Sequence, residues 1–182
     1  MKTWPVKKLT AAALLTAIGM LIPLVMPSIV IEPAGSYTLV SHVPLFIAMM
    51  ISPSMAVAVS IGTIIGFQFK LGLLGVTLRA ASHLIFASVG SLYLKHWPET
   101  LSSPLRIHLF SVLIAFLHAA FEFAIASVFF IYGQGGQMKT MLDVLLFVGL
   151  GTIIHSLIDF EIALGVFKGL RLQKSFTALT NK

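Results

Sequence analysis

The sequence contains no cysteine and few charged residues. Without cysteine, the chain has no disulfides, thiolate metal ligands or thiol catalysis, and its redox compartment stays open. Only 10% of the 182 residues are charged, whereas 58% are hydrophobic, and the mean hydropathy is +1.00. A soluble globular domain of this length rarely has such a composition. The sequence therefore predicts an integral membrane protein with no separate soluble domain.

The apolar sequence is divided into segments of roughly membrane-spanning length. A helix needs about 20 apolar residues to cross a hydrocarbon core of about 30 Å, so the chain has room for about six spans. Pro27 ends the first segment, and Ser52-Pro53-Ser54 separates the second from the third, because proline lacks an amide donor. We expect one all-α membrane domain over residues 1–182, with a loop at 27–38. Its six transmembrane helices are expected at 6–26, 39–51, 54–69, 73–94, 107–132 and 141–169.

The net charge of +6 indicates membrane topology rather than nucleic-acid binding, because the basic residues lie mostly between or beyond the apolar segments. Lysine and arginine gather on the cytoplasmic side of membrane proteins. Six spans place both termini on one side, which leaves only Lys70 and Lys139 on the other. The basic residues on the side of the termini are Lys2, Lys7, Lys8, Lys95, Arg106, Lys168, Arg171, Lys174 and Lys182. Both termini are therefore expected in the cytoplasm.

Three pairs of ionisable residues lie within the predicted spans, and the members of each pair are four residues apart. This spacing puts both side chains on one face of a helix. A charged side chain at the bilayer centre costs about 2.5–3.5 kcal/mol, so it normally faces the protein interior or an aqueous cavity. If the three faces converge, they enclose a polar pocket, to which His42 and Gln68 are possible additions. The pairs are Arg79 and His83, His118 and Glu122, and His155 and Asp159.

The pairs have two interpretations. Each could lock neighbouring helices together, but helix locking alone needs only Ser, Thr or Asn. Three pairs together favour a site for a substrate or an ion. Arg79 is the most specific member, because its guanidinium stays charged and can hold a carboxylate with two N–H groups; it could also pair with Glu122 or Asp159. Four phenylalanines near these faces could stack on a planar ring: Phe67, Phe86, Phe121 and Phe160.

A metal site is the main competing interpretation, because histidine and carboxylate four residues apart are a common ligand pair. The two His–carboxylate pairs on the fifth and sixth helices could form an intramembrane metal-dependent hydrolase in which the metal activates water. Neither pair makes a His-Glu-x-x-His motif, and the charge of Arg79 disfavours a bound cation. We therefore expect no metal, no cofactor and no catalytic residue. The hydrolase and a purely structural membrane subunit remain as alternatives.

Several segments follow the pattern of a known family. Lys7-Lys8-Leu9-Thr10 leads into an alanine-rich first helix, which is followed by a long first outer loop and a short second hairpin. Ala13-x-x-x-Ala17 matches a small-residue motif of that family. Over essentially its whole length, the chain resembles the substrate-binding S component of an energy-coupling factor (ECF) vitamin transporter. The run 36–53, Gly62-Thr63-x-x-Gly66-Phe67 and Leu78-Arg79-Ala80-x-Ser82-His83 are similar to the niacin-specific branch.

The resemblance implies a function and a set of partners. An S component captures a vitamin outside a bacterial cell and topples in the cell membrane when it meets a transmembrane coupling subunit powered by two cytoplasmic ATPases. The chain has no phosphate-binding glycine loop followed by lysine, which agrees with ATP hydrolysis on separate subunits, so it is not expected to be an enzyme. Niacin (nicotinic acid) is the expected vitamin. The alternatives are pyridoxine, hydroxymethylpyrimidine and cobalamin.

The resemblance also implies roles for particular residues. Ala13 and Ala17 would dock on the coupling subunit, and the loop 27–38, with Glu32 and Tyr37, would be the outer gate. Niacin is a planar ring with one carboxylate, so Arg79 is expected to bind the carboxylate while a histidine donates to the ring nitrogen. The expected substrate-binding residues are Arg79, His83, His118, Glu122, His155, Asp159 and His42.

Overall fold

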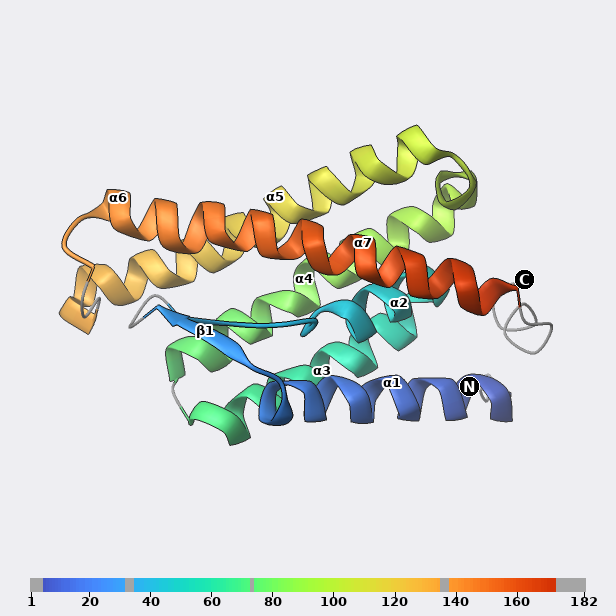
Figure 1. Cartoon of the computed structure of the whole chain (residues 1–182), viewed down its shortest axis with the longest axis horizontal. Coiled ribbons are helices and arrows are strands. Elements are labelled where there is room, and N and C mark those ends of the chain that lie inside the picture. Colours follow the sequence, from blue (N-terminus) through green and yellow to red (C-terminus); the bar gives the residue numbers. More distant parts are fainter. Residues whose placement is uncertain (1–4, 32–34, 73, 135–137, 173–182) are drawn as a thin grey trace.

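A computed structural model of the chain describes residues 5–31, 35–72, 74–134 and 138–172, and it consists of packed helices and one β-hairpin (Figure 1). The antiparallel hairpin pairs β1 (Ser28–Ile31) with β2 (Gly35–Thr38), so that Ile29 lies opposite Tyr37. A 3-10 helix (Pro98–Ser102) joins two of the α-helices. The α-helices are α1 (Val6–Val25), α2 (Val43–Ile51), α3 (Pro53–Leu71), α4 (Leu74–His96), α5 (Pro104–Phe129), α6 (Met141–Val144) and α7 (Gly151–Arg171).

Two π-helical segments interrupt the long C-terminal helices. The segment η2 (Phe130–Gln134) ends α5, and Gly133 there has the left-handed φ of 73° that suits glycine. The segment η3 (Leu145–Leu150) connects α6 to α7, so that Met141 to Arg171 forms one continuous helical segment. Short π-helical turns often occur at functional sites.

The hairpin and the start of α2 differ from the expected boundaries. The segment expected to be a loop forms strands, since the β-branched residues of Ser28–Ile31 favour extended backbone. The second helix begins at Val43 rather than at residue 39, because a turn follows β2: Val40 has a φ of 56°, and the Ser41 amide donates to the Thr38 carbonyl at 3.2 Å. This turn places His42 at the N-cap of α2.

The short helix α2 lies in the apolar core of the bundle. Every residue from Pro44 to Met50 is buried, and α2 packs against α1, α3, α4 and α7. The ring of Phe46 lies 5.2 Å from that of Phe160 and 5.8 Å from that of Phe86, measured between centroids. The core therefore joins α2 to α4 and α7, the helices that also carry polar pairs.

Helix α1 packs closely against α3 because α3 presents glycine to it. A Cβ at Gly66 would lie 2.4 Å from the Met20 carbonyl oxygen, and one at Gly62 would lie 2.5 Å from a Thr16 methyl group, so only glycine fits at either position. Ala13 and Ala17 are on another side of α1 and are exposed. Within the described part of the chain, Ala13 and Ala17 therefore do not pack against another helix.

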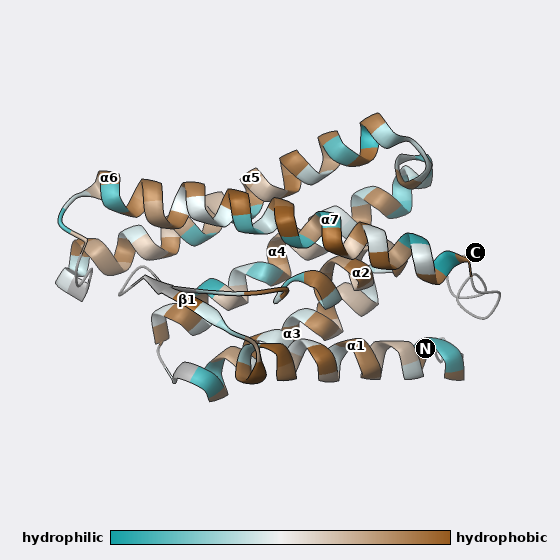
Figure 2. Ribbon diagram, viewed as in Figure 1, coloured by the Kyte–Doolittle hydropathy of each residue, from teal (hydrophilic) through white to brown (hydrophobic). Residues whose placement is uncertain are grey.

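The outer surface is strongly apolar, as expected of a membrane protein. Hydrophobic residues dominate α1 and recur along α5 and α7 (Figure 2). Three helical segments of the described chain are long and apolar enough to cross a membrane: Val6–Val25, Pro104–Gly133 and Met141–Arg171. Both ends of the chain lie at the same end of the bundle as the α4–α5 connection, and the α3–α4 and α5–α6 connections lie at the other end (Figure 1).

Candidate substrate-binding site

The expected site residues lie together in one buried group, which we call the polar cluster. It joins four parts of the fold: the N-cap of α2, and helices α4, α5 and α7. Six of its seven side chains are buried, and His155 is partly exposed. The members of the polar cluster are His42, Arg79, His83, His118, Glu122, His155 and Asp159.

Glu122 is the centre of one half of the cluster. Its Oε2 accepts a hydrogen bond from Arg79 Nη2 at 2.6 Å and another from the Thr152 hydroxyl at 2.7 Å. Its Oε1 lies 3.4 Å from His118 Nε2 and 3.5 Å from His83 Nε2. Glu122 therefore links α4, α5 and α7. Of the two carboxylates that could pair with Arg79, Glu122 and Asp159, it is Glu122 that does so.

Asp159 is the centre of the other half. Its Oδ2 accepts a hydrogen bond from the His42 amide at 2.9 Å and lies 3.1 Å from His42 Nδ1 and 3.4 Å from His155 Nε2. The Ser41 hydroxyl lies 3.3 Å from the same nitrogen of His155. The carboxylate of Asp159 therefore holds the start of α2 against α7, where the free amides of a helix N-terminus favour a negative charge.

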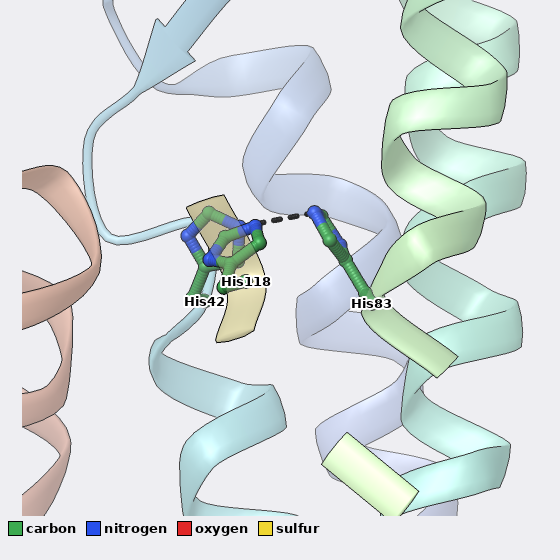
Figure 3. Close-up of side chains that lie close together, drawn as sticks. All are labelled: His42, His83 and His118. Carbon is green, nitrogen blue, oxygen red and sulfur yellow. Dashed lines mark hydrogen bonds between the residues drawn. The ribbon is translucent and has the colours of Figure 1, made fainter. Parts of the chain in front are cut away.

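His42 connects the two halves. Its Nε2 lies 3.2 Å from His83 Nε2, and the rings of His42, His83 and His118 point toward one another from three separate elements (Figure 3). The ring of Phe86 lies 4.3 Å from that of His118, between centroids, and covers this group on the core side. Imidazoles and carboxylates thus form one continuous buried network rather than three independent pairs.

A small cavity opens beside this network. Five polar-cluster residues line it, and the rest of its lining comprises Tyr37, Ser41, Phe67, Val76 and Ala80. Its volume is about 20 Å³, which is room for about one water molecule. A ring-shaped ligand needs more space, so it can enter only if part of the lining moves.

Tyr37 of β2 covers the cavity. Its hydroxyl donates to the Phe147 carbonyl and lies 3.4 Å from that of Val148; both carbonyls belong to η3. Its ring meets the ring of His155 edge-on at 5.5 Å, and the Arg79 guanidinium lies 5.8 Å from its centroid. Burial raises the pKa of the Tyr37 phenol above its ordinary value of 10.0, so the hydroxyl remains a donor at neutral pH.

The other residues named from the sequence do not all lie at the cavity. Glu32 lies outside the described residues. Gln68 is exposed, accepts a hydrogen bond from the Thr77 hydroxyl, and does not line the cavity. Of the four phenylalanines expected near a ring-shaped ligand, Phe67 lines the cavity and Phe86 covers the histidines, while Phe160 packs in the core and Phe121 is not in the lining.

Two polar residues of the site were missed from the sequence. Thr152 hydrogen-bonds Glu122, and Ser41 contacts His155. Thr152 lies three residues before His155 and so shares its helix face, which was a usable signal. Ser41 directly precedes His42, but it belongs to a turn whose geometry has no such periodicity.

Comparison with known proteins identifies the family. No family model and no solved structure match the chain. It is 39% identical over 172 residues to the niacin transporter NiaX of Lactococcus lactis subsp. cremoris (strain MG1363), and the similarity covers 94% of this chain and 77% of the relative. This match confirms the resemblance to the niacin-specific branch that the sequence predicted. The chain therefore belongs to the NiaX family.

Proposed function

We propose that the chain is the substrate-capturing S component of an ECF-type transporter that imports niacin across a bacterial cell membrane. The observation that carries the proposal is the buried polar cluster under Tyr37, in a chain whose relative is named as a niacin transporter. The chain is a transporter component rather than an enzyme, so ATP is hydrolysed on separate subunits. The hydrolase alternative is therefore not retained.

The proposed topology has six spans, with both termini in the cytoplasm. The six helices of the proposal are α1 to α5 and the continuous segment from α6 to α7, of which α2, with nine residues, crosses only part of the hydrocarbon core. In support, Lys95, Lys168 and Arg171 lie in the last turns of α4 and α7, at the end of the bundle where the chain begins and ends (Figure 1). Lys70, in the last turn of α3, lies at the other end. This distribution follows the preference of basic residues for the cytoplasmic side.

Niacin is proposed to bind within the polar cluster. Its carboxylate contacts Arg79, a histidine contacts its ring nitrogen, and Phe67 lies against the ring. Arg79 holds Glu122 in the structure, but a guanidinium has five N–H donors and can serve two carboxylates. Pyridoxine, hydroxymethylpyrimidine and cobalamin remain the runner-up substrates, of which only the small rings suit a cavity of this kind.

The hairpin is proposed to act as the outer gate. Among the described residues its strands pair only with each other, and Tyr37 fixes the hairpin to η3 through hydroxyl–carbonyl hydrogen bonding. Because the cavity is too small for niacin, movement of the hairpin away from η3 is the simplest route of entry. Tyr37 then closes over the bound ring.

The partners are proposed to be a transmembrane coupling subunit and two ATPases, with membrane lipid around the remaining surface. Ala13 and Ala17 are exposed one helical turn apart on α1, so a second helix can approach its backbone there. The glycines of α3 contact an adjacent side of α1, at Thr16 and Met20. Docking therefore leaves the polar cluster undisturbed.

Binding of labelled nicotinate and nicotinamide to the purified protein tests the proposal. We expect nicotinate to bind more tightly by about 10–100-fold, because the amide cannot form a charge-assisted pair with Arg79. Arg79→Lys keeps the charge but lacks the planar fork of the guanidinium. Its affinity for nicotinate should fall by a similar factor, while its affinity for nicotinamide should not change. Lys95→Ala, at the other end of α4, is the matched control and should change nothing. Nicotinate affinity unchanged in folded Arg79→Lys and Arg79→Ala would exclude Arg79 as the carboxylate ligand, and absence of nicotinate binding would overturn the proposal.

A further inference from the structure

Three imidazoles of the polar cluster have the spacing of metal ligands. One ring nitrogen from each of His42, His83 and His118 lies within 4.8 Å of the other two, and His42 Nε2 is 3.2 Å from His83 Nε2 (Figure 3). A tetrahedral ion with metal–nitrogen bonds of 2.0–2.1 Å places its ligand nitrogens roughly 3.3 Å apart. Small adjustments of three side chains would therefore bring the nitrogens into coordination distance.

Hydrogen bonding leaves nitrogens of these rings unused. His118 is fully buried, and neither of its ring nitrogens has a hydrogen bond among the described residues; the same holds for Nδ1 of His83. A buried polar group without a partner costs about 1–3 kcal/mol. The nearest carboxylate oxygen to His118, Oε1 of Glu122, is 3.4 Å away. A ligand that accepts a nitrogen lone pair would remove this cost at one nitrogen of His118, and a metal ion does so.

His42 is oriented as a metal ligand would be. Asp159 lies 3.1 Å from its Nδ1, which leaves Nε2 directed toward His83. A carboxylate bound to the distal nitrogen of a metal-ligating histidine is common, because it fixes the ring and raises its basicity. The same carboxylate accepts a hydrogen bond from the backbone amide of His42 at 2.9 Å, so two contacts with Asp159 fix the position of His42.

The charges of the cluster also suit a divalent cation. With neutral imidazoles, Arg79 contributes one positive charge, and Glu122 and Asp159 contribute two negative charges. The nicotinate anion adds a third negative charge to a site inside a membrane, where uncompensated charge is costly. A divalent cation brings the total to zero. Two histidine protons would give the same total charge, and the metal titration below distinguishes them from an ion.

We infer that His42, His83 and His118 bind a divalent first-row transition ion such as Zn²⁺, and that its open position receives the ring nitrogen of niacin in place of a direct histidine contact. Imidazole and pyridine nitrogens are both suitable ligands for such ions. Arg79 does not prevent this, since Glu122 neutralises it at 2.6 Å. The metal site stands independently, whereas the contact with the ring nitrogen rests on the proposed function.

Cobalt titration of the full chain, purified without a histidine tag and treated with chelator, tests the site. We expect one Co²⁺ per chain, with the visible bands of a four-coordinate ion, and competition by Zn²⁺. Nicotinate should shift the bands, while benzoate, which lacks the ring nitrogen, should not. His118→Gln and His83→Gln should lower metal affinity at least as much as loss of a supporting carboxylate, which costs about 10–100-fold, and Asp159→Asn should fall within that range.

His155→Gln discriminates between the two possible metal groups. His155 belongs to a second possible group, with His42 and Asp159, so an unchanged metal affinity in this variant assigns the ion to the three-histidine site. Loss of metal in His155→Gln but not in His118→Gln would overturn that assignment. Absence of the cobalt bands from folded protein that binds nicotinate would overturn the metal site and leave the proposed function standing. Metal binding with no response to nicotinate would count against the ring-nitrogen contact alone.

Discussion

The polar cluster and the outer face of α1 differ in almost every physical property. The cluster buries Arg79, Glu122 and Asp159 in a network that crosses four elements. The α1 face presents Ala13 and Ala17 to the surroundings and has no ionisable group between them. One region offers directional contacts to a small polar molecule, and the other offers close backbone approach to a second helix. On the proposed function, capture and docking would use different elements, so each should be open to change without the other.

The largest effect is expected from the docking face. The double substitution Ala13→Trp and Ala17→Trp should reduce niacin uptake by cells to background, because two indole rings prevent close approach of a partner helix. Nicotinate binding by the purified variant should stay within twofold of the unchanged chain, since α1 does not line the cavity. Uptake of labelled nicotinate and equilibrium binding measure the two quantities.

A matched control is available on α5. Ala120 and Ala124 are also exposed and four residues apart, so tryptophan at both tests whether bulk on any outer face is harmful. Uptake should be normal in that variant. Equal loss in both variants would mean that uptake senses the general shape of the bundle, and loss of binding in the α1 variant would assign Ala13 and Ala17 to the fold.

Much of the polar cluster could be predicted from the sequence because helical periodicity is strong. The spacing of His118 and Glu122, and of the other pairs, puts each pair on one face, and the cost of charge in lipid turns those faces inward. The pairing of Arg79 with Glu122 rather than Asp159 depends on how the helices pack, which periodicity leaves open. Helical spacing alone makes His42 only a possible addition to the pocket, because its burial depends on the turn after β2.

The hairpin and η3 show where prediction from the sequence stopped. Proline, glycine and a glutamate predict an irregular loop between residues 27 and 38, whereas the β-branched residues of Ser28–Ile31 favour the strand that the structure has. The sequence of Leu145–Leu150 has ordinary apolar composition, so no residue indicates π-helical geometry. Its carbonyls nevertheless receive the hydroxyl of Tyr37, a contact across 110 residues. Such contacts depend on tertiary packing and have no local signal.

The second largest effect should come from separating Arg79 and Glu122. Glu122→Leu leaves the guanidinium buried without its carboxylate, and breaking such a pair costs about 3–5 kcal/mol of the free energy of unfolding. The double variant Arg79→Met, Glu122→Leu should recover much of that loss, because no unpaired charge remains. Nicotinate binding should stay lost in both variants. Unfolding in detergent and nicotinate binding, measured on the same samples, separate stability from capture. Recovery of binding in the double variant would mean that the pair only locks the helices.

The smallest effect is expected at the gate. A Cβ at Gly151 would lie 2.8 Å from the Tyr37 hydroxyl, so Gly151→Ala should displace the ring and weaken its hydrogen bond to η3. Loss of about 0.5–1.5 kcal/mol corresponds to roughly 2–10-fold faster release of labelled nicotinate. Tyr37→Phe removes the hydroxyl without crowding and should give a similar factor.

Gly165→Ala controls for the general preference of helices for alanine. Apart from the neighbouring backbone of its own helix, no atom of the described residues lies within 4 Å of a Cβ at Gly165, which is also in α7, so this variant should gain some helix stability without a change in release. Faster release in Gly151→Ala alone, with Tyr37→Phe unchanged, would show that crowding alters η3 rather than the hydroxyl contact. Unchanged release in both would remove Tyr37 from the gate. Faster release in both, with uptake still dependent on Ala13 and Ala17, would place gate and docking face under separate control within one small bundle.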